Sequence, residues 1–201
     1  MIRVLLAEDQ AMVRGALAGL LSLEPDIEVV AQVARGDEVL EAAQAQRPDV
    51  ALLDIEMPGA DGLQAAAQLR SELPACKILM LTTFGRPGYL RRAMEQGAAG
   101  FLLKDDPSDA LARAIRRAMR GERVVDPGLA AAALSEGPSP LTAREHDVLS
   151  AARENATVAD IASVLHLSPG TVRNYLSEAI SKLGVANRIE AARLARQKGW
   201  L

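Results

Sequence analysis

The sequence predicts an α/β fold in two parts: a five-stranded, parallel, doubly wound domain, followed by an all-α helix-turn-helix domain. Two observations carry this prediction. Short apolar runs alternate with helix-like stretches through residues 1–121, as they do in parallel sheets covered by helices. After a turn-rich segment, SEGPSP at 135–140, the pattern is helical throughout. We therefore expect domains at 1–121 and 141–201, joined by a linker at 122–140 that contains a short helix.

The composition is that of a folded, water-soluble chain. Of 201 residues, 49% are hydrophobic and 24% are charged, which excludes intrinsic disorder. Aromatic residues make up only 2%, too few for the stacking platforms of most single-strand-binding proteins. Cys76 is the sole cysteine, so an internal disulfide is excluded. The printed sequence opens without a basic and apolar leader and holds no apolar run of about 18 residues, so we expect a cytoplasmic protein with no membrane partner.

The strands of the first domain are predicted from short runs that are mostly apolar. Continuous apolar character indicates burial on both faces, which favours a parallel sheet. The runs are IRVLLA (2–7), IEVVAQV (27–33), DVALLD (49–54), KILMLT (77–82) and AGFLL (99–103). Helix-like stretches lie at about 10–23, 36–46, 61–72, 88–97 and 108–120. Gly97 and Gly121 stand where helix C-caps are expected.

The linker and the second domain carry several helix-start signals. Asp126 followed by Pro127 predicts the N-cap and first turn of a short alanine-rich helix. Thr142 and Glu145 have the spacing of a capping box, and Ser168 precedes a proline at a first helical position. The expected helices span about 142–153, 157–165, 169–183 and 187–198.

Charge is divided unevenly between the two parts. Residues 1–136 hold 15 basic and 20 acidic side chains, a net charge of −5, whereas residues 137–201 hold 8 and 6, a net charge of +2. Within 168–201 the counts are 6 and 2, a net charge of +4. The C-terminal end is therefore the part suited to bind a polyanion.

Chemically active side chains gather at the predicted strand ends of the first domain. Glu8 and Asp9 follow the first strand, Asp54 ends the third, Thr82 ends the fourth, and Lys104 follows the fifth. In an open parallel sheet these ends meet at one edge. Carboxylates brought together repel one another unless a cation lies among them, and Mg²⁺ is the natural candidate for oxygen ligands beside a phosphoryl group. The layout predicts phosphoryl transfer to Asp54.

These residues, with the strings LLDIEMPGADG and FLLKD, closely resemble the receiver domain of bacterial two-component response regulators over all of 1–121. The resemblance implies that Asp54 is the phosphoacceptor and that a sensor histidine kinase is the phosphodonor. It implies the following further roles. Asp9, Asp54 and the Glu56 backbone carbonyl would bind Mg²⁺, Glu8 would act on it through water, Thr82 and Lys104 would bind phosphoryl oxygens, and Phe101 would turn inward when Thr82 moves.

In the second domain, the helices at 157–165 and 169–183 have the lengths and short turn of a helix-turn-helix. Val172, Leu176 and Ile180 place one apolar stripe inward. The residues left facing outward are Thr171, Arg173, Asn174 and Ser177. Arginine and asparagine read guanine and adenine edges in the major groove, whereas Lys182 and Arg188 are placed better for phosphates. For each of these outward residues taken singly, an ordinary solvent-exposed position on a helix explains it equally well.

The stretch from LTAREHDVLSAA to the C-terminus resembles the NarL/LuxR-type output domain over essentially its whole length. The resemblance implies that Arg173, Asn174 and Ser177 face bases and that the helix at 187–198 supplies a dimer interface. Together the two resemblances imply a DNA-binding regulator that dimerises on promoters when Asp54 is phosphorylated. Within the family, LTTFGRPGYLRRAMEQGAAGFLLKD and TVRNYLSEAI resemble DesR-like regulators, which implies control of membrane-lipid genes.

Two other classes of protein fit parts of the pattern. A haloacid-dehalogenase-like phosphatase also forms an aspartyl phosphate, but it needs a second aspartate two residues after the nucleophile. That place holds Glu56, and no cap domain is present. An interaction module with a degenerate receiver is the other alternative, and the complete set of site residues argues against it. We therefore expect a regulator and not an enzyme.

Overall fold

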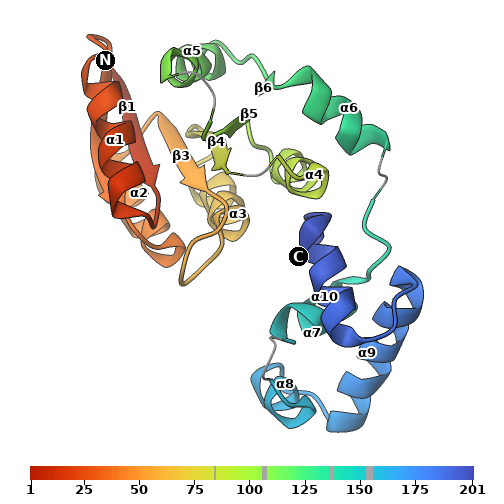
Figure 1. Cartoon of the computed structure of the whole chain (residues 1–201). Coiled ribbons are helices and arrows are strands. Elements are labelled where there is room, and N and C mark those ends of the chain that lie inside the picture. The colour runs from red at the N-terminus through yellow and green to blue at the C-terminus, as the bar shows by residue number, and fades with distance from the viewer. Residues whose placement is uncertain (84, 106–107, 136–137, 153–155) are drawn as a thin grey trace. The chain divides into compact units, whose positions relative to one another are not determined.

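The computed structural model describes residues 1–83, 85–105, 108–135, 138–152 and 156–201. The chain divides into two compact units: residues 1–85 with 90–131, and residues 86–89 with 132–201. Figure 1 shows a sheet flanked by helices in the first unit, whereas the described elements of the second are helices. No helix in the described part of the chain has the length and apolarity that a bilayer crossing requires.

All strands of the first unit run parallel in one sheet, in the order β2-β1-β3-β4-β5-β6. Their bounds are β1 (Ile2–Ala7), β2 (Ile27–Val33), β3 (Val50–Asp54), β4 (Lys77–Thr82), β5 (Gly100–Leu103) and β6 (Val124–Val125). Each β-to-β connection up to β5 passes through a helix, which confirms the predicted doubly wound arrangement. The five predicted runs all form strands, with ends that differ by at most one residue.

The sheet has one strand more than predicted. β6 lies in the segment expected to be a linker and pairs with β5, with Val124 opposite Gly100 and Val125 opposite Phe101. The pairing is close, since a Cβ on Gly100 would lie 2.7 Å from the Val124 carbonyl oxygen. Two residues carry no periodicity, so only the neighbouring strand makes this segment a strand.

The helices of the first unit cover both faces of the sheet. They are α1 (Ala11–Ser22), α2 (Val39–Gln46), which follows a 3₁₀ turn at Gly36–Glu38, α3 (Gly62–Glu72) and α5 (Ser108–Met119). Two further helices, α4 (Pro87–Glu95) and α6 (Pro127–Ser135), have residues in both units. Side chains alternate along a strand. Val4 and Leu6 thus share one core with Leu21 of α1 and Ile115 of α5. The fully buried Leu5 points to the opposite face, where α2 contacts β1 and α3 contacts β3.

The second unit consists of α7 (Ala143–Ala151), α8 (Val158–Val164), α9 (Pro169–Leu183) and α10 (Arg188–Gln197). The predicted caps are present: Thr142 and Glu145 form a capping box, and the Ser168 side chain accepts a hydrogen bond from the Thr171 N–H. Gly184 ends α9 in the left-handed conformation. Because these signals are local, α9 begins and ends where the sequence predicts.

The core of the second unit forms where α7, α8, α9 and α10 meet. α9 contributes Val172, Leu176 and Ala179, all of them buried. Ile180, predicted on the same stripe, is only half-buried but packs against this core. Trp200, the only tryptophan of the chain, also packs against it. α8, a short turn and α9 thus form the predicted helix-turn-helix, with the opposite face of α9 left open to solvent.

Candidate functional site

Three carboxylates converge at the carboxyl edge of the sheet. Glu8 follows β1 and is fully buried, Asp54 ends β3 and is 4% exposed, and Asp9 is exposed beside them. Each offers a carboxylate oxygen, and these oxygens all lie within 4.8 Å of one another. This convergence was expected, because the carboxyl ends of parallel strands meet at one edge of a sheet. β1 and β3 are neighbours in that sheet.

Lys104, which follows β5, reaches the same cluster. Its Nζ lies 2.7 Å from Glu8 Oε2 and 3.1 Å from Asp54 Oδ2. Backbone groups orient the two carboxylates: the Ile55 N–H donates to Asp54 Oδ1 at 2.8 Å, and the Gln10 N–H donates to Glu8 Oε1 at 3.2 Å. The pair of buried acids is thereby held in one position, with one Asp54 oxygen directed at the Lys104 ammonium.

A residue outside the predicted set supports this arrangement. The Arg14 guanidinium, on the first turn of α1, donates to the Glu8 carbonyl oxygen at 2.5 Å. It therefore ties the start of α1 to the end of β1, where the acids lie. A lone arginine on a helix gives no sequence signal for such a contact, because the target is a backbone oxygen.

The charges in the cluster do not balance. Burial raises the pKa of Asp54 to about 6; the Lys104 ammonium opposes this rise, and the Glu8 carboxylate adds to it. Burial alone would lower the pKa of Lys104, but Glu8 and Asp54 outweigh it and raise that pKa. One ammonium among three carboxylates leaves room for further positive charge.

The donor set fits a magnesium ion. Every side-chain group in the acidic cluster is a carboxylate oxygen, the ligand type that Mg²⁺ prefers. Glu8 Oε2 is buried and accepts no hydrogen bond from the described residues, although the Lys104 ammonium lies near it. The pKa of Asp54 is raised mainly by burial, and a cation bound by Asp9 and Asp54 would offset the smaller part of that rise that comes from repulsion by Glu8.

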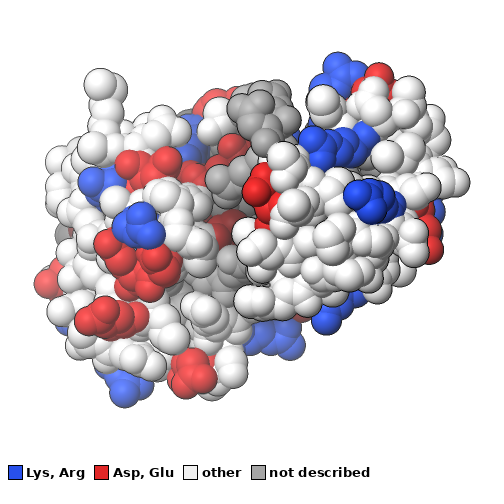
Figure 2. Space-filling view, turned by 90° about the horizontal axis from the view of Figure 1, so that it is seen from below, with Lys and Arg blue, Asp and Glu red and all other residues white. Residues whose placement is uncertain are grey.

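The other predicted site residues of the first unit lie around this cluster. Thr82 is the last residue of β4 and is 4% exposed, and its carbonyl accepts a hydrogen bond from the Lys104 N–H. Phe101 lies on β5, opposite Met80 of β4, and its ring is buried. Glu56 is exposed, two residues beyond Asp54. Figure 2 shows that Asp and Glu side chains gather on the surface in the left-hand part of the view, where the first unit lies.

We predict that Asp54→Asn stabilises the metal-free protein near neutral pH. Because the pKa of Asp54 in the folded state is about 6, its charged form disfavours folding, and the stability present at low pH is lost as the pH rises through 6. The Asp54→Asn variant loses the attraction to Lys104, which offsets part of this stabilisation. We therefore expect the free energy of unfolding of Asp54→Asn to exceed that of wild type by about 1 to 2 kcal/mol at about pH 7.5. Thermal melts in EDTA at about pH 7.5 and pH 5 measure it. A variant less stable than wild type at the higher pH would contradict the prediction.

The predicted DNA-facing residues share one face of α9. Arg173, Asn174 and Ser177 are exposed. Thr171 is half-buried, and its hydroxyl lies 2.8 Å from Ser168 Oγ at the helix N-cap. Glu178, absent from the predicted set, is exposed one turn after Asn174. The spacing of four residues was the available signal for it.

The two residues expected to contact phosphates differ in their surroundings. Lys182 Nζ lies 2.7 Å and 2.8 Å from the two carboxylate oxygens of Glu145, on α7. Arg188 is the first residue of α10 and is half-buried. Glu145 is 1% exposed and was recognised in the sequence only as a helix cap.

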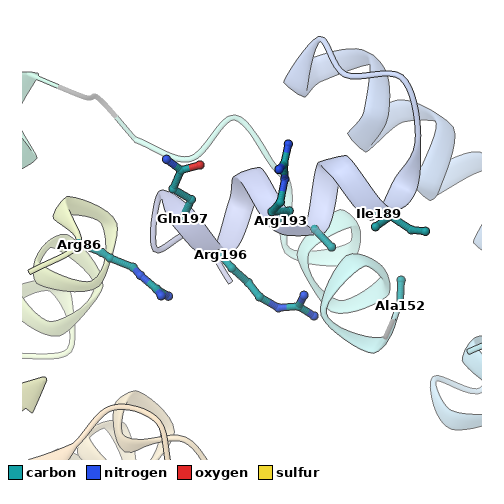
Figure 3. A pocket seen from close by; sticks show the side chains of 7 residues that line it. Arg86, Ala152, Ile189, Arg193, Arg196 and Gln197 are labelled. Atoms are coloured by element: carbon teal, nitrogen blue, oxygen red, sulfur yellow. The ribbon is translucent and has the colours of Figure 1, made fainter. Parts of the chain in front are cut away.

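The helix expected to supply a dimer interface presents an open face. Figure 3 shows the side chains of Ile189, Arg193, Arg196 and Gln197 along α10. All are exposed, and Ile189 keeps 56% of its surface in solvent. An exposed β-branched side chain between arginines is a feature that an interface would bury.

Comparison with known proteins places both units in families. Residues 4–116 match the response regulator receiver domain, and residues 139–195 match the bacterial regulatory proteins of the luxR family. The chain is 47% identical over 200 residues to the transcriptional regulatory protein DesR of Bacillus subtilis, covering 100% of this chain and 99% of that relative. It is 48% identical over 201 residues to the uncharacterized transcriptional regulatory protein YvfU of the same organism, covering both chains fully.

A solved structure agrees in both units. The crystal structure of the response regulator ChrA of a heme-sensing two-component system is 34% identical, with a TM-score of 0.58 over 100% of this chain and 98% of that one. The residues at the carboxyl edge of the sheet and the helix-turn-helix therefore belong to one known combination of domains. The chain is a member of the NarL/LuxR family of two-component response regulators, a DNA-binding transcriptional regulator similar to DesR.

Proposed function

We propose that Asp54 accepts a phosphoryl group from a partner sensor histidine kinase and that this modification promotes dimerisation and promoter binding. The observation that carries the proposal is the position of the buried Asp54 carboxylate between Glu8, Asp9 and the Lys104 ammonium. The buried carboxylate at the end of a parallel strand is the nucleophile, and the groups around it are those that phosphoryl transfer uses.

In the proposed reaction, an Asp54 carboxylate oxygen attacks the phosphorus of a phosphohistidine. The new bond is an acyl phosphate, and the phosphorus–nitrogen bond to the kinase histidine breaks. A bound Mg²⁺ would neutralise charge on the phosphoryl oxygens. Asp9, Asp54 and the Glu56 carbonyl would hold it, and Glu8 would act through water.

Residues of β4 and β5 complete the proposed site. Lys104 already lies 3.1 Å from Asp54 Oδ2, so its ammonium can pair with a phosphoryl oxygen attached there. The Thr82 hydroxyl would donate to another phosphoryl oxygen. Phe101, on the neighbouring strand, is the aromatic residue that would turn inward when Thr82 moves, and its ring is buried in this structure.

The output step uses the second unit. We propose that the exposed residues Arg173, Asn174 and Ser177 of α9 contact base edges and that Arg188 contacts a phosphate. Two such units joined through α10 would read adjacent half-sites. Because its target is promoter DNA, the protein would act in the cytoplasm, without a membrane partner.

We predict a phosphoryl adduct on Asp54 that needs magnesium. Wild type and Asp54→Asn are incubated with acetyl phosphate, with Mg²⁺ or with EDTA, and their intact masses are compared. Only wild type with Mg²⁺ should gain one phosphoryl group, because only it has both nucleophile and cation. Size-exclusion chromatography of the same samples should show a dimer only where the adduct forms.

Glu41→Gln is the matched control, because Glu41 lies on α2 outside the acidic cluster. It should react like wild type. An equal adduct on Asp54→Asn would overturn the assignment of Asp54. An unmodified wild type with Mg²⁺ and acetyl phosphate, and equally unmodified after incubation with a phosphorylated histidine kinase domain, would overturn the proposed function.

The enzyme alternative makes a different prediction. A phosphatase would hydrolyse small phosphate esters with many turnovers, whereas a regulator should release at most one phosphate per chain. Release of inorganic phosphate from para-nitrophenyl phosphate distinguishes the two.

We further propose that the promoters bound by this regulator include those of membrane-lipid genes. The 47% identity to DesR supports it, and mapping of bound promoters tests it.

A further inference from the structure

The Glu145 carboxylate is the most deeply buried charge of the second unit among the described residues. It is 1% exposed, yet it lies on the first turn of α7. Its Oε2 accepts a hydrogen bond from the Thr142 N–H at 2.7 Å, which completes the capping box. A helix cap explains one oxygen, but it does not explain why the carboxylate is buried.

Lys182 supplies the remaining contacts. Its Nζ lies 2.7 Å from Glu145 Oε1 and 2.8 Å from Oε2, so one ammonium binds both oxygens. Burial would raise the pKa of Glu145, but the hydrogen bonds from Lys182 and Thr142 outweigh it and hold that pKa below its ordinary value. The carboxylate is therefore charged and paired across a separation of 37 residues.

The pair joins two elements at defined points. Glu145 lies at the start of α7, and Lys182 lies in the last turn of α9, one residue from its end. Ala179 is the last fully buried residue of α9, and the half-buried Ile180 and Leu183 beyond it pack against the same core. Apolar packing has no preferred direction, whereas an ion pair in which one ammonium contacts both carboxylate oxygens does.

We propose that Lys182 is a positioning residue that sets the orientation of α9 through Glu145, in place of the phosphate contact expected from the sequence. The bonded ammonium holds the end of α9 against α7. The exposed face with Arg173, Asn174 and Ser177 is thereby presented at one angle to the major groove. The proposal rests on DNA recognition by that face.

The test compares specific with non-specific DNA binding. The full-length protein, treated with acetyl phosphate and Mg²⁺, first selects a duplex from a random-sequence pool. Affinity for this duplex and for a scrambled one is then measured from about 50 to 200 mM salt, the range over which counterion release is resolved. The variants are Lys182→Met, Lys182→Arg, Glu145→Gln and, as a phosphate-contact comparison, Arg188→Gln. Circular dichroism checks that each variant is folded at the temperature of the assay.

The positioning role predicts that Lys182→Met lowers affinity for the selected duplex about tenfold or more, which is the size of one lost bidentate base contact. Affinity for the scrambled duplex and the salt slope should change little. Glu145→Gln should show the same loss although Glu145 is buried. Lys182→Arg should recover most of the affinity, because a guanidinium can bind both carboxylate oxygens.

A phosphate contact predicts the opposite pattern. Lys182→Met would weaken both duplexes alike and reduce the salt slope by about 0.9, as expected for Arg188→Gln. Glu145→Gln would then free Lys182 and leave affinity unchanged or higher. Either of these results, for Lys182→Met or for Glu145→Gln, overturns the proposal. So does a folded Lys182→Met that binds the selected duplex as tightly as wild type. If wild type enriches no duplex, the proposed DNA recognition fails instead.

Discussion

Replacement of Gly62 by alanine should unfold or severely destabilise the first unit. Gly62 is the first residue of α3, and its N–H donates to the Ile55 carbonyl at 2.9 Å. A Cβ built on Gly62 would lie 1.9 Å from the Asp54 carbonyl oxygen and 3.1 Å from Ile55 Cα. Both neighbours are backbone atoms of the strand end that carries the phosphoacceptor, so no side chain can rotate away.

The expected loss of stability is about 3 kcal/mol or more, because overpacking against backbone must move the helix or the strand. Movement of either would displace Asp54 from Lys104, so any folded remainder should form little phosphoryl adduct. Circular dichroism melts measure the stability, and intact mass after acetyl phosphate treatment measures the reaction.

Gly15→Ala provides the control within the same unit. Gly15 lies in the middle of α1, is exposed, and has no atom within 4 Å of an added Cβ. Alanine there should raise stability by about 0.5 to 1 kcal/mol, since glycine is a poor helix former. If Gly62→Ala melts and reacts like wild type, the prediction is wrong, and the junction between β3 and α3 can move enough to accommodate a Cβ.

Loss of the Lys182 ammonium should cost the second unit about 3 kcal/mol. Lys182→Met leaves the Glu145 carboxylate buried and without its cation, which is more costly than the absence of the pair. This loss of unfolding free energy is smaller than for a fully buried ion pair, because the Lys182 side chain is 39% exposed and water solvates part of the pair. Urea unfolding followed by the fluorescence of Trp200 reports on this core alone, since the chain has one tryptophan.

The double variant Glu145→Gln/Lys182→Met should recover most of the lost stability. Glutamine keeps an acceptor for the Thr142 N–H and carries no charge to strand. The interaction free energy from the double-mutant cycle should then be about 2 kcal/mol. Additive effects of the two substitutions would show that the pair contributes no coupling.

The sequence alone was sufficient for elements whose signals are local. The ends of α9 follow from Ser168, Pro169 and Gly184, because capping and proline geometry act within a few residues. The five predicted strands follow from short, mostly apolar runs. The acidic cluster was also predictable, because parallel strands bring their carboxyl ends to one edge, where Glu8 and Asp54 then meet.

Tertiary structure decided which groups touch. β6 is a strand only because β5 offers it a partner, and Gly62 is required because α3 starts against the backbone of Asp54. Lys182, which the sequence predicts as a phosphate contact, forms an ion pair with Glu145, 37 residues away along the chain. Such contacts depend on how helices pack, and helix packing is set by the whole core and not by any local pattern. Local sequence patterns therefore predicted most of the elements and the chemistry of their side chains, whereas the packed fold set β6 and the contacts that those side chains make.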